Sequence, residues 1–201
     1  NLTIDASHDL TISGSIFNTG AGTTTLNSTG DVTETKTGAI KAANLLLSGT
    51  TGNYTLNNPA NSVGTLTMNT SNVSYVDADS LSLGTSKLTG ALNLITNGEI
   101  TQTGALSVIG TTSFTAGTND ITLTNSDNNF EGAVSVVLGK NVSIKDADSI
   151  TLDALNVSDN LTIDASHDLT ISGSIFNSGA GTTTLNSTGT VTESGGASDT
   201  A

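Results

Sequence analysis

The chain has 201 residues, with 18 acidic side chains against five lysines and no arginine, so its formal net charge is −13. An acidic surface without arginine cannot supply the counterion release that drives sequence-independent nucleic-acid binding, so nucleic acid is excluded as a partner. No apolar run approaches the roughly 18 residues that a membrane-spanning helix needs, and we expect a protein that is not membrane-embedded. The absence of cysteine excludes disulfides, thiolate metal sites and a thiol nucleophile.

Two distant segments of the chain have almost the same sequence. Residues 1–34 read NLTIDASHDLTISGSIFNTGAGTTTLNSTGDVTE, and residues 160–193 repeat them, so that Asn160 is the counterpart of Asn1. The two copies differ at Thr19 against Ser178 and at Asp31 against Thr190. Such self-similarity is typical of a solenoid, a propeller or an array, in which each unit buries its apolar face against its neighbours.

A second, weaker repeat lies between these copies. NVSYVDADSLSLG from Asn72 aligns with NVSIKDADSITLD from Asn141. We expect one repeat region over residues 1–193. Because Asn1 is not a methionine and no signal-peptide pattern follows it, we interpret the chain as an internal piece of a longer protein, with a flexible tail or fragment boundary at 194–201.

Short runs along the chain alternate apolar with small polar residues. In chain order these runs include residues 2–4, 10–12, 65–68, 81–83, 121–123, 142–144 and 150–152. A period of two indicates strands, and the Thr, Val and Ile that fill the runs favour strands as well. Gly, Asn, Asp or Ser closes each run, as expected for turns. We therefore predict many short strands and no helix.

The spacing of the strands indicates how they are stacked. Neighbouring strands begin at Leu2 and Leu10, and again at Val73 and Leu81, with the same separation. The separation of Asn72 and Asn141 is about three times a coil of about 23 residues, and that of Asn1 and Asn160 is about seven times such a coil. We predict an all-β fold, a parallel β-helix (β-solenoid) with about 20–23 residues and three short strands per coil. Apolar residues would stack inward, Thr and Ser would face water, and Asn would form amide ladders at the turns.

One stretch of the sequence resembles a known family. EITQTGALSVIGTTSFTAGTNDITLTNSDNNFEGAVSVVLGKNVSIKDADSITLDALNVSDNLTIDAS, Glu99 to Ser166, is similar to the repeat shafts of filamentous-haemagglutinin-like exoproteins and large autotransporter adhesins of Gram-negative bacteria. The resemblance implies a right-handed parallel β-helix and export to the cell surface or the medium. The secretion domain and membrane barrel of complete family members are not in this chain, so the export route stays open.

Two pairs of carboxylates are the candidate metal ligands. Asp77 and Asp79 form the first Asp-Ala-Asp motif, and Asp146 and Asp148 form the second. Alternate side chains of a strand share a face, so each pair could offer two oxygens to Ca²⁺. The alternative is that Asp recurs because its side chain hydrogen-bonds the backbone of a turn. The Gly-rich nonapeptide of calcium-binding β-rolls is absent from the sequence.

The sequence offers little for catalysis, and we expect no enzyme and no cofactor. A glycosidase or lyase needs paired carboxylates across a cleft, usually with aromatic platforms, but the chain has only four Phe, two Tyr and no Trp, and no arginine to hold an acidic sugar. His8 and His167 are repeat equivalents without a second histidine near either in sequence. A metal site there would need help from another coil, so we interpret both as turn residues.

The expected function is therefore structural: a shaft segment of a large bacterial surface or secreted adhesin or filament. Its partners would be a host or neighbouring-cell surface, or glycans, reached through the parent protein. The near-identical segments also make end-to-end self-association of the chain an option. The alternatives are a glycan-binding solenoid, a β-helical polysaccharide lyase or hydrolase, and an ice-binding solenoid. Possible N-glycosylation sequons begin at Asn1, Asn27, Asn53, Asn69, Asn72, Asn141, Asn156, Asn160 and Asn186.

Overall fold

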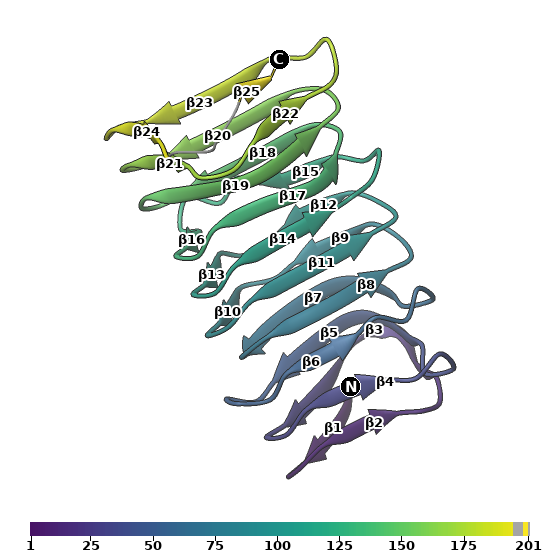
Figure 1. Cartoon of the computed structure of the whole chain (residues 1–201). Helices are drawn as coiled ribbons and strands as arrows, with labels where there is room; N and C mark the ends of the chain where they lie inside the picture. The colour runs from purple at the N-terminus through teal and green to yellow at the C-terminus, as the bar shows by residue number, and fades with distance from the viewer. Residues whose placement is uncertain (195–198, 201) are drawn as a thin grey trace.

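The computed structural model describes residues 1–194 and 199–200, and these residues form a rod of stacked coils (Figure 1). They contain 25 β-strands and no helix, so none of them forms a helix that could cross a membrane. The chain winds steadily from one end of the rod, where β1 lies, to the other, where β23 lies (Figure 1).

Two parallel sheets run the length of the rod. The main strands of sheet A are, in stacking order, β1 (Leu2–Ala6), β3 (Ile16–Ser28), β5 (Ile40–Ser48), β7 (Ser62–Thr70), β9 (Leu81–Leu83), β12 (Ile100–Gln102), β15 (Ile121–Leu123), β18 (Val142–Asp146), β20 (Leu161–Ala165) and β23 (Thr183–Ser187). The main strands of sheet B are β2 (Leu10–Ile12), β4 (Val32–Glu34), β6 (Tyr54–Leu56), β8 (Val73–Asp77), β11 (Leu92–Thr96), β14 (Thr112–Thr115), β17 (Val134–Gly139), β19 (Ile150–Val157), β21 (Leu169–Ile171) and β24 (Val191–Glu193).

Short additional strands supply a third side to several coils. Sheet A includes β10 (Ser86–Leu88), β13 (Leu106–Val108) and β16 (Asn129–Phe130), and sheet B includes β22 (Ile175–Asn177) and β25 (Asp199–Thr200). Parallel strands with alternating inward residues confirm the predicted β-solenoid, which has about nine turns. The expected tail at 194–201 lies largely outside the described residues; within it, Asp199–Thr200 pair with β22.

The coil length falls within the predicted range of about 20–23 residues, but the prediction that the repeats span three and seven coils is wrong. Strands β1 and β20, which begin the two near-identical copies, are eight steps apart in sheet A, which corresponds to roughly 20 residues per coil. Paired residues are 22 positions apart at Leu2 and Thr24 but 17 apart at Leu66 and Leu83. The turns therefore vary in length while the strands stay parallel, with register shifts between β3 and β5, β14 and β17, and β17 and β19. Repeat spacing alone could not give the coil count.

The weaker repeat covers three and a half coils. Its first copy begins with β8 in sheet B, and its second begins with β18 in sheet A. Three further strands of sheet B, ending with β17, separate the two copies. A strand with its alternating residues can join either sheet, because both sheets bury one side-chain face against the same interior. Successive repeat units are thus turned by about half a revolution around the rod.

The interior holds the apolar side chains of both sheets. Leu92 and Leu94 of β11 are buried while Asn93 between them is exposed, and this alternation recurs along the rod. Phe114 and Phe130 meet edge to face inside it, with ring centroids 6.5 Å apart. The Tyr54 hydroxyl donates to the carbonyl of Leu26 at 3.0 Å, which satisfies its one polar group.

Asp and Asn at the turns into sheet B form the predicted side-chain ladder. Asp9 Oδ1 accepts the backbone N–H of Asp31 at 2.9 Å, and Asp31 Oδ1 accepts Asn53 Nδ2 at 2.9 Å. Asn53 Oδ1 accepts Asn72 Nδ2 at 2.7 Å, and Asn72 Oδ1 accepts the N–H of Ala91 at 2.7 Å. A similar ladder at the turns into sheet A passes through Asp120, Asn141, Asn160 and Thr182. These bonds fix the corners of successive coils to one another.

The segment LTIDA occurs in both β1 and β20, so it allows a test of how much stability a coil gains from its neighbouring coils. Ile163 is buried between Ile144 and Leu185, whereas Ile4 pairs with Leu26 alone and is part-exposed. We expect Ile163→Ala to lower the free energy of unfolding by about 2–5 kcal/mol and Ile4→Ala by clearly less. Urea unfolding of both variants measures this, and equal losses would contradict it.

Candidate functional site

The first Asp-Ala-Asp motif is divided between the interior and the surface. Asp77 is buried, and its Oδ2 accepts the N–H of Val63 at 3.0 Å and the hydroxyl of Tyr75 at 2.9 Å. Its Oδ1 accepts the N–H of Asp79 at 2.9 Å, while the Asp79 side chain is exposed and Asp79 Oδ2 accepts the Ser62 hydroxyl at 2.8 Å. Burial raises the pKa of Asp77 despite these hydrogen bonds.

The second motif has the same arrangement. Asp146 is buried, and its two oxygens accept the N–H groups of Phe130 at 2.8 Å and Asp148 at 2.7 Å. Burial again raises the pKa of the buried carboxyl. Asp148 is exposed, and its Oδ1 lies 3.1 Å from His167 Nδ1. Each motif thus places one carboxylate inside the rod and one outside, because the turn begins directly after the first Asp.

The two histidines lie at the surface, as the sequence predicts for turn residues. His8 Nδ1 is 3.0 Å from the Ser7 hydroxyl, and His167 pairs with Asp148. Among residues 1–194 and 199–200, no three Asp, Glu or His side chains gather where they could hold a metal ion. The backbone bonds of Asp77 and Asp146 instead match the turn interpretation of both motifs.

A groove on sheet A is the feature that the sequence did not predict. The strand β7 faces two short strands in the next coil, β9 through Thr65 and Leu66 and β10 through Asn69 and Thr70. The partner strand is interrupted at Gly84, where a Cβ atom would lie 2.3 Å from Thr67 Oγ1.

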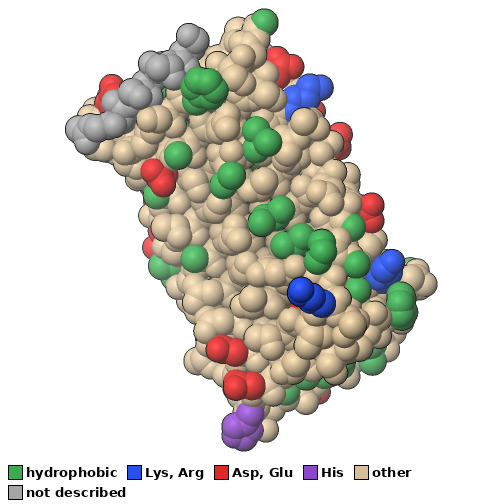
Figure 2. Space-filling view, turned by 45° about the vertical axis from the view of Figure 1, so that its right-hand side comes forward, with side chains coloured by type: hydrophobic (Ala, Val, Ile, Leu, Met, Phe, Trp, Pro, Cys, Tyr) green, Lys and Arg blue, Asp and Glu red, His purple; other side chains and the backbone are tan. Residues whose placement is uncertain are grey.

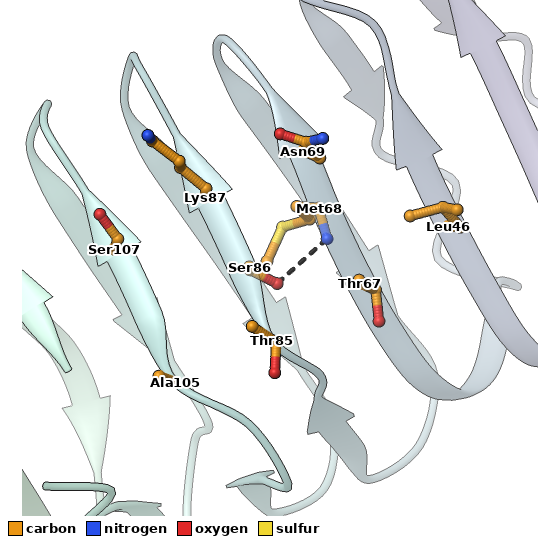
Figure 3. A pocket seen from close by; sticks show the side chains of 9 residues that line it. All are labelled: Leu46, Thr67, Met68, Asn69, Thr85, Ser86, Lys87, Ala105 and Ser107. Carbon is orange, nitrogen blue, oxygen red and sulfur yellow. Dashed lines mark hydrogen bonds between the residues drawn. The ribbon is translucent and has the colours of Figure 1, made fainter. Parts of the chain in front are cut away.

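Ser86 closes the gap in backbone pairing that this interruption leaves. Its Oγ accepts the N–H of Met68 at 3.0 Å (Figure 3). It also donates to the carbonyl of Gly84 at 2.8 Å. A groove of about 520 Å³ lies beside this bridge. Its lining consists of Leu46, Thr67, Met68, Asn69, Thr85, Ser86, Lys87, Ala105 and Ser107.

The groove differs from the rest of the surface in its charge. Lys87 is the one charged residue in its lining, in a chain with 18 acidic and five basic residues. Lys87 is exposed, and Figure 3 shows it on the strand next to Asn69. Carboxylates and lysines are otherwise scattered singly or in small groups over the face seen in Figure 2. The sequence signal for the groove is LGTSKL, where the two-residue alternation stops at Gly84 and resumes at Ser86.

Exposed apolar side chains are few on the described surface. Phe17 and Phe176, the repeat equivalents, are 67% and 47% exposed, and Val137 is 58% exposed. Val137 and Phe176 line a second hollow of about 490 Å³ on sheet B, together with Asp153 and Asn156. On the face seen in Figure 2, uncharged polar side chains and backbone make up most of the remaining surface.

The repeat units of the rod match a known family. Residues 70–137 and 139–195 each match the family described as repeats of unknown function (DUF5649). The matched segments begin just before Asn72 and Asn141, so they have the register of the weaker internal repeat. Searches of curated proteins and of solved structures gave no match.

The divided Asp motifs predict unequal effects of two neighbouring substitutions. Asp146→Ala leaves the buried N–H of Phe130 without its acceptor and should cost about 1–3 kcal/mol of unfolding free energy. Asp148→Ala removes an exposed ion pair with His167 and an exposed hydrogen bond from the N–H of Ser149, and should cost about 0–1 kcal/mol. Urea unfolding separates the two outcomes.

The same variants address the calcium interpretation. We expect Ca²⁺ to leave the Tm of the unaltered chain unchanged, since Asp77 and Asp146 already accept internal donors. A Ca²⁺-dependent rise in Tm that Asp148→Ala abolishes would instead assign Ca²⁺ to the second motif.

Proposed function

We propose that this chain, which belongs to the family of repeats of unknown function (DUF5649), is a segment of a structural shaft with no chemistry of its own. The observation that carries the proposal is the unbroken succession of parallel strands in two sheets from β1 to β24. In such a rod each coil is held by its neighbours, so length can grow without a change in the interior.

The length of the family unit, three and a half coils, supports this role. Each family unit adds three and a half coils and leaves strands of either sheet ready to pair with the next unit. Coils that differ in turn length, such as the short one from Leu66 to Leu83 and the long one from Leu2 to Thr24, still stack in one rod. A shaft of stacked coils tolerates this variation, because the turns lie at the surface outside the paired strands.

The wall of the rod suits an isolated fibre. Outward positions are largely Thr, Ser and Asn, and the net charge of −13 opposes lateral association. The backbone bonds between coils run along the rod axis, so tension along the axis is shared by the strands of both sheets.

We further propose that the shaft is part of a secreted or surface-attached bacterial fibre or adhesin. The similarity of residues 99–166 to the shafts of such exoproteins supports this location. The partners would then be a host or neighbouring-cell surface, contacted by other parts of the parent protein.

The shaft proposal predicts a fixed relation between sequence length and fibre length. Each added family unit should lengthen the rod by about 17 Å, from three and a half coils at about 4.8 Å each. Electron microscopy of the native protein and of versions with added or removed units measures the increment. Immunogold labelling of intact producing cells tests the location, and intracellular label alone would contradict it.

A glycan-binding module is the second candidate, and the sheet A groove favours it. The groove lies in the roughly 300–1,000 Å³ range of small-molecule sites, and its lysine stands beside hydroxyl and amide groups without a carboxylate in the lining. These groups suit an acidic sugar.

A glycan array with acidic and neutral oligosaccharides tests this candidate. Binding of acidic oligosaccharides should weaken at least about tenfold in Lys87→Ala, which corresponds to about 1.4 kcal/mol. Lys41→Ala, which removes an exposed lysine outside the groove, should leave binding unchanged. No binding by the unaltered chain, or equal losses in both variants, would reject the candidate.

A further inference from the structure

Two corners of the rod are built to the same plan from different residues. We call Glu34, Asn58 and Asn61 the acid corner, and Gln102, Asn125 and Asn128 the amide corner. Glu34 ends β4 in sheet B and Gln102 ends β12 in sheet A, so the corners lie in opposite sheets. The same structural position therefore carries a carboxyl group in the acid corner and a carboxamide in the amide corner.

The amide corner is a closed set of hydrogen bonds. Gln102 Oε1 accepts Asn128 Nδ2 at 2.9 Å and the N–H of Asn125 at 3.1 Å. Gln102 Nε2 in turn donates to Asn128 Oδ1 at 2.8 Å and to the carbonyl of Gly104 at 2.6 Å. Gln102 and Asn128 thus form a reciprocal pair in which each carboxamide both donates and accepts. Asn128 Oδ1 also accepts the N–H of Leu106 at 2.9 Å.

The acid corner repeats the accepting half of this pattern. Glu34 Oε2 accepts Asn61 Nδ2 at 3.0 Å and the N–H of Asn58 at 3.0 Å, as Gln102 Oε1 does in the other corner. Asn61 Oδ1 accepts the N–H of Ile40 at 2.7 Å, as Asn128 Oδ1 does from Leu106. Glu34 Oε1, the counterpart of the donating Gln102 Nε2, is buried and has no hydrogen-bond partner.

We propose that Glu34 is a proton-binding site whose carboxylic acid form completes the acid corner. With a proton on Oε1, the carboxyl group would donate to Asn61 Oδ1 and accept from Asn61 Nδ2, which is the reciprocal pair of the amide corner with O–H in place of N–H. Without the proton, a buried anionic oxygen occupies a position built for a donor, and an unpaired buried charge is costly.

The groups around Glu34 do not offset this charge. On its own chain segment, Lys36 is exposed and forms no ion pair among the described residues. Ile12 of β2 pairs with Glu34 and is apolar, and β6 contributes Tyr54. From β8 the nearby titratable groups are Tyr75 and Asp77, an acidic pair joined by a hydrogen bond of 2.9 Å. Neither residue carries a positive charge that could stabilise an ionised Glu34.

The pKa directions agree with this geometry. Burial raises the pKa of Glu34 above its usual value of 4.5, although hydrogen bonds from Asn61 and Asn58 oppose the rise. Because the folded chain binds this proton more tightly than the unfolded chain, stability should rise as pH falls through the raised pKa toward 4.5, and level off below it. The coils from β4 to β8 would thus be held less firmly in alkaline than in mildly acidic medium.

Exchange of the two corner residues tests the proposal. Glu34→Gln should raise the Tm by about 2–4 °C at pH 8, and the gain should vanish near pH 4. Gln102→Glu should place the same pH dependence in the amide corner, lowering the Tm at pH 8 and recovering it near pH 4. Comparison with the unaltered chain at each pH removes the contributions of the other carboxyls, which these variants retain.

A direct titration completes the test. In the unaltered chain, the side-chain carboxyl carbon of Glu34, followed by NMR, should titrate above 4.5. Titration of Glu34 at or below 4.5 would overturn the proposal, even if a variant failed to fold. A Glu34→Gln variant whose Tm differs from that of the unaltered chain equally at pH 4 and pH 8 would overturn it as well.

Discussion

The whole structure depends on the backbone pairing between one coil and the next. Each strand must find its N–H and C=O partners in the neighbouring coils, because a buried unpaired backbone group is costly. This requirement keeps the strands parallel and paired over about nine turns, with local register shifts, while the turns change length freely. Ile4 and Ile163 have the same local sequence and different burial, since only Ile163 has a coil on both sides.

Polar side chains enter the rod where this pairing is interrupted. Ser86 accepts the N–H of Met68, Asp77 that of Val63, and Asp146 that of Phe130. These side chains take the place of missing backbone carbonyls, so their oxygens serve the fold. Where the substitute is an acidic residue, a carboxyl group must be buried, and the acid and amide corners show two ways of meeting the same need.

The repeat length of three and a half coils connects the fold to its proposed role. Because one family unit spans three and a half coils, equivalent residues of successive units lie in opposite sheets, as β8 and β18 do. Any surface feature carried by every unit would therefore alternate between two sides of a long shaft. Such an array would present a repeated feature in two rows along its length.

The sequence by itself determined the strands, the absence of helix in the described residues, the stacking and the amide ladders, because alternation and turn residues are local signals. Only the tertiary structure decided the coil count, since the short coil at Leu66 and the long coil at Leu2 depend on how each turn packs. It also decided which Asp of each motif is buried, where Gly84 opens a groove, and that Glu34 and Gln102 hold equivalent positions. These facts depend on residues from neighbouring coils, which the pattern along one strand does not contain.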